Sequence, residues 1–352
     1  MNARRGSIAL ASLAVFLLSA VLSAQNPPQP TKKLTKAEEK ERDAIYALLN
    51  AGTTPDDLGL TWVRDDLLKA SGNQQYVPFI VSFDAVESAV EEPDRVLAAR
   101  RAVGRGTGRR RGCPAKKDEK KDDKKAPQQF AFEGLTPLAV TGSDGPNMRV
   151  SRSFAALPGT YEMIVVVKEA TPEKTAKNAP PLKTSVLKKT IEVPDLWNGE
   201  LNTSSVFVGR IDPLPAPLTP QQQMERPYAI GGMEITPEVT TKFTKKAELS
   251  TFMLIYNPKT NADNKPDILV EYNFYAKEAG AEKFFNKTNP QSLNAQTLPP
   301  QFDFAAGHQL QAGQAIPLGS FPEGDYRLEI KVTDKLANKT LTRDVNFSVA
   351  GS

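Results

Sequence analysis

The sequence contains one cysteine and one histidine among 352 residues, and these two scarcities exclude several kinds of site. Cys113 has no partner for an intrachain disulfide, so the fold depends on its apolar cores for stability. A Ser-His-Asp or Cys-His arrangement would have to use His308, and a metal site with several histidine ligands is excluded. The sequence also lacks a Gly-rich phosphate loop, a dinucleotide-binding fingerprint, a zinc cysteine cluster and a haem motif. We therefore assign no catalytic, cofactor-binding or metal-ligating residue and expect no cofactor.

Long apolar runs are absent after the first part of the chain. Two arginines precede an apolar stretch that begins at Ile8, and Ala24 ends a sequence suited to signal-peptide cleavage. The stretch is shorter than the roughly 20 residues of a transmembrane helix. We expect residues 1–24 to be a secretory signal peptide, residues 25–34 to be a tether, and the mature chain to have no transmembrane helix. The expected location is the periplasm, the cell surface or the outside of a bacterium.

Positive charge is concentrated in one tract. From Arg100 to Lys125, twelve basic and four acidic residues give a local charge of +8, so the rest of the chain is acidic. No aromatic residue is interleaved to stack on bases, which argues against nucleic acid as a partner. The favoured interpretation is a disordered, solvated insertion between strands, over about 100–127. The alternative is that the tract binds an unknown protein or a polyanionic component of the cell envelope.

Helical spacing of apolar residues is confined to the start of the mature chain. The pattern predicts one helix over 36–51, and Thr54 followed by Pro and two acids predicts a second helix that ends near Gly72. From residue 73 onward, alternating apolar residues between clusters of Gly, Pro, Asn and Asp predict strands. Because long helices do not alternate with these strands, we expect an all-β fold of antiparallel sandwiches and no parallel α/β sheet.

One sequence pattern occurs twice, as LPGTYEMIVVVKEA and as FPEGDYRLEIKVTD. In each copy, Pro and Gly predict a turn, a tyrosine follows two residues after the Gly, and apolar residues then alternate. This arrangement is typical of the tyrosine corner of immunoglobulin-like sandwiches, in which the hydroxyl bonds to nearby backbone. We expect Tyr161 and Tyr326 to be buried corner residues. The repetition predicts two tandem immunoglobulin-like sandwiches, over 73–196 and 197–352, preceded by a helical segment over 35–72.

The first copy of the pattern is apolar on both faces of its strand. Ile164 and Val166 occupy the positions that carry charged residues in the second copy. A strand that is apolar on both faces is covered on both. We therefore expect the N-terminal helical segment to pack over Ile164 and Val166.

The second half of the sequence resembles a group of exported proteins. Its segments GGMEITPEVTTKF, KPDILVEYNFYA and IPLGSFPEGDYRLEIKVTD are similar to the C-terminal sandwich of uncharacterised exported β-sandwich proteins of Gram-negative soil bacteria. The resemblance covers mainly the C-terminal half. It implies an exported immunoglobulin-like fold and supplies no catalytic residue.

Two reactive side chains have both a chemical and a structural interpretation. His308 lies in AAGHQLQAG without a nucleophile elbow, so a position in a surface loop is favoured over catalysis. Cys113 lies among arginines and lysines, which lower the pKa of a thiol, but an incidental unpaired thiol within the insertion is favoured.

One loop and one aromatic residue complete the candidates. Asn261, Asp263, Asn264 and Asp267 supply the oxygens that calcium accepts, but they lack an EF-hand pattern, and a hairpin turn is favoured. Tyr275, at an expected exposed strand position, is a candidate for a carbohydrate-binding face, although single exposed aromatic residues are common.

These observations favour a non-catalytic envelope or secreted protein that acts as an interaction or structural module. The first alternative is a carbohydrate-binding or enzyme-accessory protein of the same fold. The second is a carboxylate-dependent hydrolase, because carboxylates are plentiful and sequence spacing does not fix their separation in space. Our leading interpretation is that the chain is not an enzyme.

Overall fold

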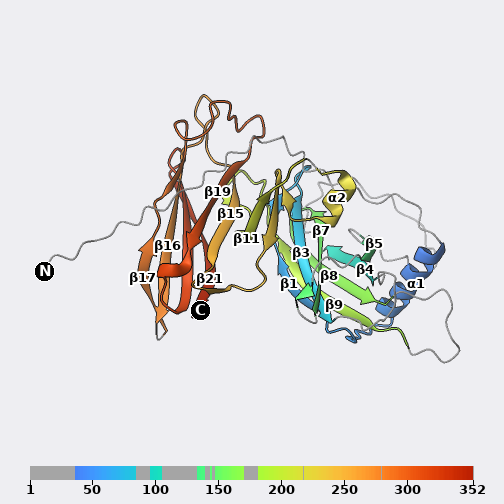
Figure 1. Cartoon of the computed structure of the whole chain (residues 1–352). Helices are drawn as coiled ribbons and strands as arrows, with labels where there is room; N and C mark the ends of the chain where they lie inside the picture. Colours follow the sequence, from blue (N-terminus) through green and yellow to red (C-terminus); the bar gives the residue numbers. More distant parts are fainter. Residues whose placement is uncertain are drawn as a thin grey trace. The chain divides into compact units, whose positions relative to one another are not determined.

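The computed structural model describes residues 36–84, 96–104, 133–138, 143–144, 147–169, 181–216, 218–278 and 280–351. Strands dominate this part of the chain, which forms two compact units (Figure 1). The N-terminal unit extends to Asp195, except that Asp66–Lys69 belong with Leu196–Ser352 in the C-terminal unit. The expected signal peptide, 1–24, and tether, 25–34, lie outside the described residues. Among those described, no helix has the length and apolarity needed to cross a bilayer.

Two sheets form the N-terminal unit. One sheet contains, in hydrogen-bonded order, β1 (Thr61–Asp65), β3 (Gln75–Asp84), β7 (Asn147–Ala156) and β6 (Ser143–Asp144). The other contains β5 (Glu133–Leu138), β4 (Val96–Gly104), β8 (Gly159–Lys168) and β9 (Thr184–Val193). Both sheets bury apolar side chains almost completely, including Phe79, Phe83 and Met163. The all-β fold class is therefore confirmed.

The expected helical segment over 35–72 is only half right. Helix α1 (Lys36–Asn50) confirms the first predicted helix. The second predicted helix is wrong, because the chain turns at Gly59, with a φ of 57°, and continues as β1. The Trp62 ring stacks on that of Phe79 in β3, with centroids 4.8 Å apart and planes 9° apart. This cross-strand packing, together with β-branched neighbours, outweighs the helix-start signal.

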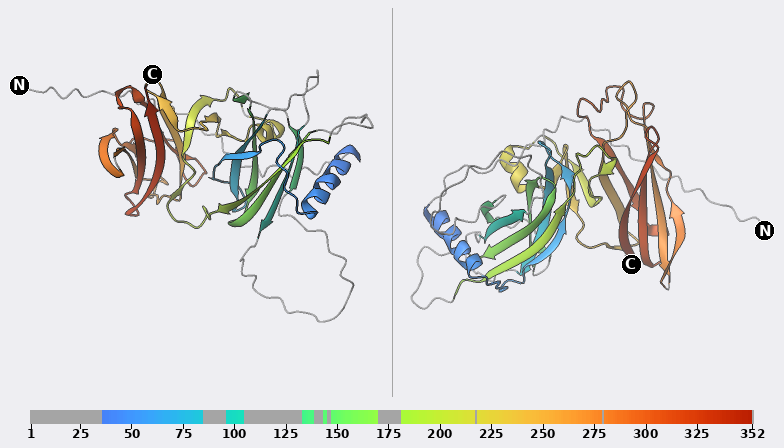
Figure 2. Two further views of the ribbon diagram at one scale, coloured as in Figure 1. Left: turned by 90° about the horizontal axis from the view of Figure 1, so that it is seen from below. Right: turned by 180° about the vertical axis from the view of Figure 1, so that it is seen from behind.

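Helix α1 covers one face of β8 and β9 (Figure 2). Ile45 of the helix is 2% exposed and packs in one apolar cluster with Ile164, Val166 and Val186. Two partly buried leucines of α1 extend the same contact. The prediction that a helix covers the second apolar face of the first copy is therefore confirmed.

The basic insertion begins later than the sequence predicts. Arg100 lies in the middle of β4, where it is paired with Val165 of β8, and β4 also pairs with β5. The predicted start at residue 100 is wrong because the charge count ignores the strand pattern of VLAARRAVG, whose backbone groups pair on both sides. Residues 105–127, which include Cys113, lie outside the described residues.

Two further sheets form the C-terminal unit. One contains, in order, β10 (Asn202–Thr203), β15 (Glu248–Tyr256), β11 (Phe207–Pro213), β13 (Met233–Pro237) and β12 (Ala229–Ile230), with β19 (Leu310–Pro317) on β15. The other contains β14 (Lys242–Thr244), β21 (Lys339–Ala350), β20 (Gly324–Asp334), β16 (Ile268–Glu278) and β17 (Ala281–Lys287), with β18 (Gln291–Leu293) on β16. Two short helical segments are α2 (Pro220–Glu225) and η1 (Leu318–Ser320). The β14–β21 pair is parallel, which departs from the expected purely antiparallel sandwich.

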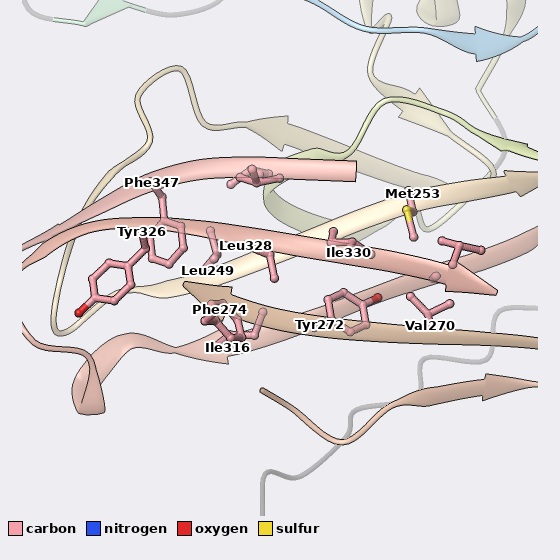
Figure 3. Packing of buried hydrophobic residues seen from close by; sticks show 14 of the residues in the cluster. Leu249, Met253, Val270, Tyr272, Phe274, Ile316, Tyr326, Leu328, Ile330 and Phe347 are labelled. Atoms are coloured by element: carbon pink, nitrogen blue, oxygen red, sulfur yellow. The ribbon is translucent and has the colours of Figure 1, made fainter. Parts of the chain in front are cut away.

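A single apolar core fills the space between these two sheets (Figure 3). Leu249 and Ile316 come from one sheet, and Tyr272, Leu328 and Ile330 come from the other. Each of these five side chains is at most 3% exposed. The alternation read in the second copy of the pattern therefore confirms which face of β20 is buried.

Each copy of the repeated pattern contains a tyrosine corner. The Tyr161 hydroxyl donates to the carbonyl oxygen of Leu157, and the Tyr326 hydroxyl donates to that of Pro322, each at 2.8 Å. The two tyrosines are 8% and 2% exposed, and burial raises the pKa of both phenols. The corner prediction is confirmed in both units.

A short segment from early in the sequence completes the C-terminal unit. Asp66 is 1% exposed and accepts a 3.1 Å hydrogen bond from the Tyr228 hydroxyl. The Leu67 amide donates to Ser205 Oγ at 2.9 Å, and the Ser205 amide donates back to the Leu67 carbonyl at 2.9 Å. Strand β2 (Leu68–Lys69) follows directly. The C-terminal unit is therefore assembled from two stretches that are distant in sequence.

Candidate interaction surface

Neighbouring strands of the C-terminal unit place a row of side chains on the outward face of one sheet. The register pairs Asn346 of β21 with Arg327 of β20, Arg327 with Tyr275 of β16, and Tyr275 with Phe284 of β17. The next residue along β20, Leu328, is fully buried, so alternation directs this row away from the core. We define the outer sheet face as Tyr275, Glu282, Phe284, Arg327, Glu329 and Asp344.

Arg327 organises the charges of the outer sheet face. Its guanidinium donates to Glu282 at 2.9 Å, to Asp344 at 2.7 Å and to Glu329 at 3.3 Å. Partial burial alone would lower the pKa of this guanidinium, but the hydrogen bonds to Asp344, Glu282 and Glu329 outweigh it and raise the pKa. Three carboxylates around one cation leave the cluster with a net negative charge.

Two aromatic rings lie beside this cluster. The guanidinium carbon of Arg327 is 4.5 Å from the ring centroid of Tyr275. The Tyr275 ring meets the Phe284 ring edge-on, with centroids 5.9 Å apart. Phe284 is 52% exposed and is fixed on a strand that pairs with β16. The outer sheet face therefore presents a large apolar ring next to an ordered, negatively charged cluster.

Sequence reasoning identified Tyr275 but missed Phe284 and Arg327. Tyr275 is partly covered by the guanidinium and is half-buried, so its expected exposure is only partial. Phe284 adjoins Phe285, whose ring packs 5.0 Å from that of Phe321 at the core. Adjacent residues of a strand point to opposite faces, so the Phe-Phe pair itself signals that one ring is exposed.

His308 lies in the loop before β19, as predicted. Its Nδ1 accepts a 2.9 Å hydrogen bond from the Asp303 amide, and its ring lies 5.8 Å from that of Phe302. The Asp303 carboxylate in turn accepts from two further amides of the loop, at 2.8 and 3.1 Å. Both side chains therefore hold the loop in shape.

The loop that contains Asn261 is a hairpin turn, as favoured from the sequence. The Asn261 side-chain oxygen accepts from the amides of Asp263 and Lys265, each at 3.0 Å. Asn264 adopts a φ of 55°, a left-handed conformation that asparagine tolerates in turns. In the part of the chain that the structure describes, no cluster of three or more His, Cys, Asp or Glu side chains is arranged to hold a metal ion.

Comparison with known proteins yields only distant structural similarity. No protein-family model matches the chain, and no curated protein matches it. Among solved structures, Salmonella alpha-2-macroglobulin reacted with methylamine matches 85% of this chain at 11% identity with a TM-score of 0.21. Trypsin-activated alpha-2-macroglobulin from Escherichia coli matches 85% at 10% identity with a TM-score of 0.22. This chain spans 17% of the length of each of those proteins, and TM-scores this low carry no functional argument.

Proposed function

We propose that this chain is an exported, non-catalytic interaction protein and that the outer sheet face contacts its partner. The observation that carries the proposal is Phe284, a ring that is 52% exposed and is fixed between a paired strand and Tyr275. Aromatic residues and arginine are enriched at protein–protein interfaces, and the outer sheet face places the exposed Phe284 ring beside Tyr275 and Arg327. Export is inferred from the N-terminal sequence of residues 1–24.

The geometry of the outer sheet face supports binding because its side chains are already held in place before a partner binds. Tyr275 and Phe284 project from paired strands, and Arg327 is held by three carboxylates. A preorganised surface loses less side-chain entropy on association. Covering the exposed part of one phenylalanine contributes about 1 kcal/mol to binding, roughly half of the full burial value.

Charge defines the chemistry of the proposed partner. The carboxylates of Glu282, Glu329 and Asp344 outnumber the single guanidinium of Arg327, so a basic rim on the partner is complementary. Each carboxylate accepts a hydrogen bond from that guanidinium, so the positions of the three negative charges are fixed before a partner binds. We therefore propose a protein partner with an apolar contact site surrounded by lysine or arginine.

Capture of partners from a cell-envelope extract tests this proposal. The mature chain is compared with the Phe284→Ser variant and with a matched control, Leu157→Ser, in which an equally exposed side chain of the N-terminal unit is changed. We expect Phe284→Ser to lose a partner that the wild type and Leu157→Ser retain, with capture weaker at high salt. Identical capture by all three proteins would refute the use of this face.

A carbohydrate-binding function is the second candidate, favoured by the adjacent rings of Tyr275 and Phe284 on one sheet face. A glycan array distinguishes the two functions. Saturable binding of a neutral glycan that Phe284→Ser abolishes would favour this candidate over a protein partner, whereas no binding to any glycan would exclude it.

A further inference from the structure

A cavity of about 270 Å³ lies among the loops at one end of the C-terminal unit. Its walls come from the turn after β15, at 257–259, from the β20–β21 turn, at 334–339, and from residues 199–201 before β10. Pockets for drug-sized ligands have volumes of about 300 to 1,000 Å³. The cavity therefore suits a smaller ligand, about one sugar ring in size.

Hydrogen bonds to buried or turn-forming side chains hold these walls in place. Asn257 adopts a φ of 55° and donates to the carbonyls of Leu196, at 3.0 Å, and Glu200, at 2.7 Å. Asp334 is 1% exposed and accepts from two amides of its own turn and, at 2.7 Å, from the amide of Lys259. The cavity is therefore preformed, and its walls do not depend on a ligand.

Lysine ammonium groups supply positive charge at this cavity. Lys259 is exposed, and its ammonium forms no ion pair within the described portion of the chain. Lys339 also lines the cavity and is paired with Glu200. Asp334 is the one acidic side chain in the lining, and its carboxylate oxygens are directed to backbone donors. The ammonium of Lys259 is therefore available to an anionic ligand.

An exposed indole adjoins the cavity. Trp197 is 42% exposed, and the ammonium of Lys69 lies 4.3 Å from its ring centroid. The same ammonium donates to the side-chain oxygen of Asn257, a cavity wall residue, at 2.5 Å. One shared lysine thus links the indole to the wall and places an aromatic ring beside the charged site.

We propose that this cavity binds the carboxylate-bearing ring of an acidic glycan, a uronic acid residue. The volume accommodates one ring, and the ammonium of Lys259 pairs with the carboxylate beside the ion pair of Lys339 and Glu200. Trp197 lies outside the cavity lining, where Lys69 connects it to the wall residue Asn257. Lysine acts as a point charge and does not require a particular carboxylate orientation. The site shares no residue with the outer sheet face, so it stands independently of the protein partner proposed above.

Titration of the mature chain with glucuronate, followed by amide NMR shifts and calorimetry, tests this site. We expect saturable binding that shifts the amides of Gly199 and Lys259, and at least tenfold weaker binding of glucose. The Lys259→Gln substitution should weaken the binding of glucuronate at least tenfold. The control Lys283→Gln, which changes an exposed lysine of β17, should bind as the wild type does.

Any of the following results would overturn the proposal. The first is equal affinity for glucose and glucuronate, which would remove the role of charge. The second is unchanged glucuronate binding in Lys259→Gln, or shifts confined to other amides. The third is inorganic phosphate binding as tightly as glucuronate, which would make the cavity a general anion site. Short oligomers of uronic acid, compared with the free monomer, distinguish a glycan end from a free sugar acid.

Discussion

Removing one hydroxyl group, in a Tyr326→Phe variant, should lower the free energy of unfolding of the C-terminal unit by about 1 kcal/mol. The ring is 2% exposed and lies 5.3 Å from the rings of both Phe321 and Phe347, contacts that phenylalanine retains. Only the 2.8 Å hydrogen bond to the carbonyl of Pro322 is lost. Pro322 is exposed, so water can satisfy the carbonyl, and the cost stays well below that of a buried orphan group.

Two comparison variants separate the hydroxyl from the ring. Tyr326→Ala should cost about 3 to 5 kcal/mol because it removes buried ring contacts and leaves a cavity. Tyr161→Phe breaks the equivalent bond to Leu157, also 2.8 Å long, and should cost about 1 kcal/mol in the N-terminal unit.

Urea unfolding followed by circular dichroism, with calorimetry to resolve the transitions of the two units, measures these effects. A Tyr326→Phe protein as stable as the wild type would show that the corner hydroxyl contributes nothing. A loss above about 3 kcal/mol would contradict the argument that the ring contacts survive.

Three further predictions concern buried polar groups and the basic tract. Burial raises the pKa of the Tyr272 phenol above its unfolded value of about 10. The neutral phenol therefore contributes its full stability below pH 10. Above pH 10 the free energy of unfolding falls, by at most about 1.4 kcal/mol per pH unit. Tyr272→Phe should flatten the fall in melting temperature between pH 9 and 11.5, and an unchanged slope would contradict this. Gln75 is fully buried, and neither polar atom of its side chain has a hydrogen-bond partner among the described residues. Because Gln75→Met removes these two unpaired groups, it should raise the free energy of unfolding by about 1 to 3 kcal/mol. A lower melting temperature than that of the wild type would refute this prediction. Deletion of 105–125 should leave the melting temperature of the N-terminal unit nearly unchanged, whereas deletion of 100–125 removes half of β4 and should unfold that unit. Equal melting temperatures for the two deletions would show that the pairing of β4 is dispensable.

The spacing of apolar residues correctly predicted those features that depend on residues close together in the sequence. The alternation that begins at Tyr326 gave the buried face of β20, and the apolar pair at Ile164 and Val166 predicted the covering helix. The second helix failed because a helix-start signal is worth little against the stacking of Trp62 on a strand that is distant in sequence. Charge counting misplaced the start of the insertion because Arg100 belongs to β4, whose backbone pairs with both β5 and β8.

The candidate surfaces depended on register and on chain crossings that the sequence does not display. Phe284 is adjacent to Tyr275 only because β17 folds back on β16 with a shifted register. Lys69 reaches Trp197 only because residues 66–69 belong to the C-terminal unit. Of the residues on the outer sheet face, only Tyr275 was predicted from the sequence, because the alternation of side chains along its strand places it on the exposed face.

Site-specific photo-crosslinking shows whether the outer sheet face contacts a partner after export. A photoreactive benzoylphenylalanine replaces Phe284 in one protein and Leu157, which is 54% exposed in the N-terminal unit, in the other. Both proteins are produced with their native N-terminal sequence and are irradiated in intact cells. We expect one crosslinked protein at position 284, on a chain that has lost residues 1–24, and none at position 157. Crosslinking that is absent at position 284, or equal at both positions, would contradict this expectation.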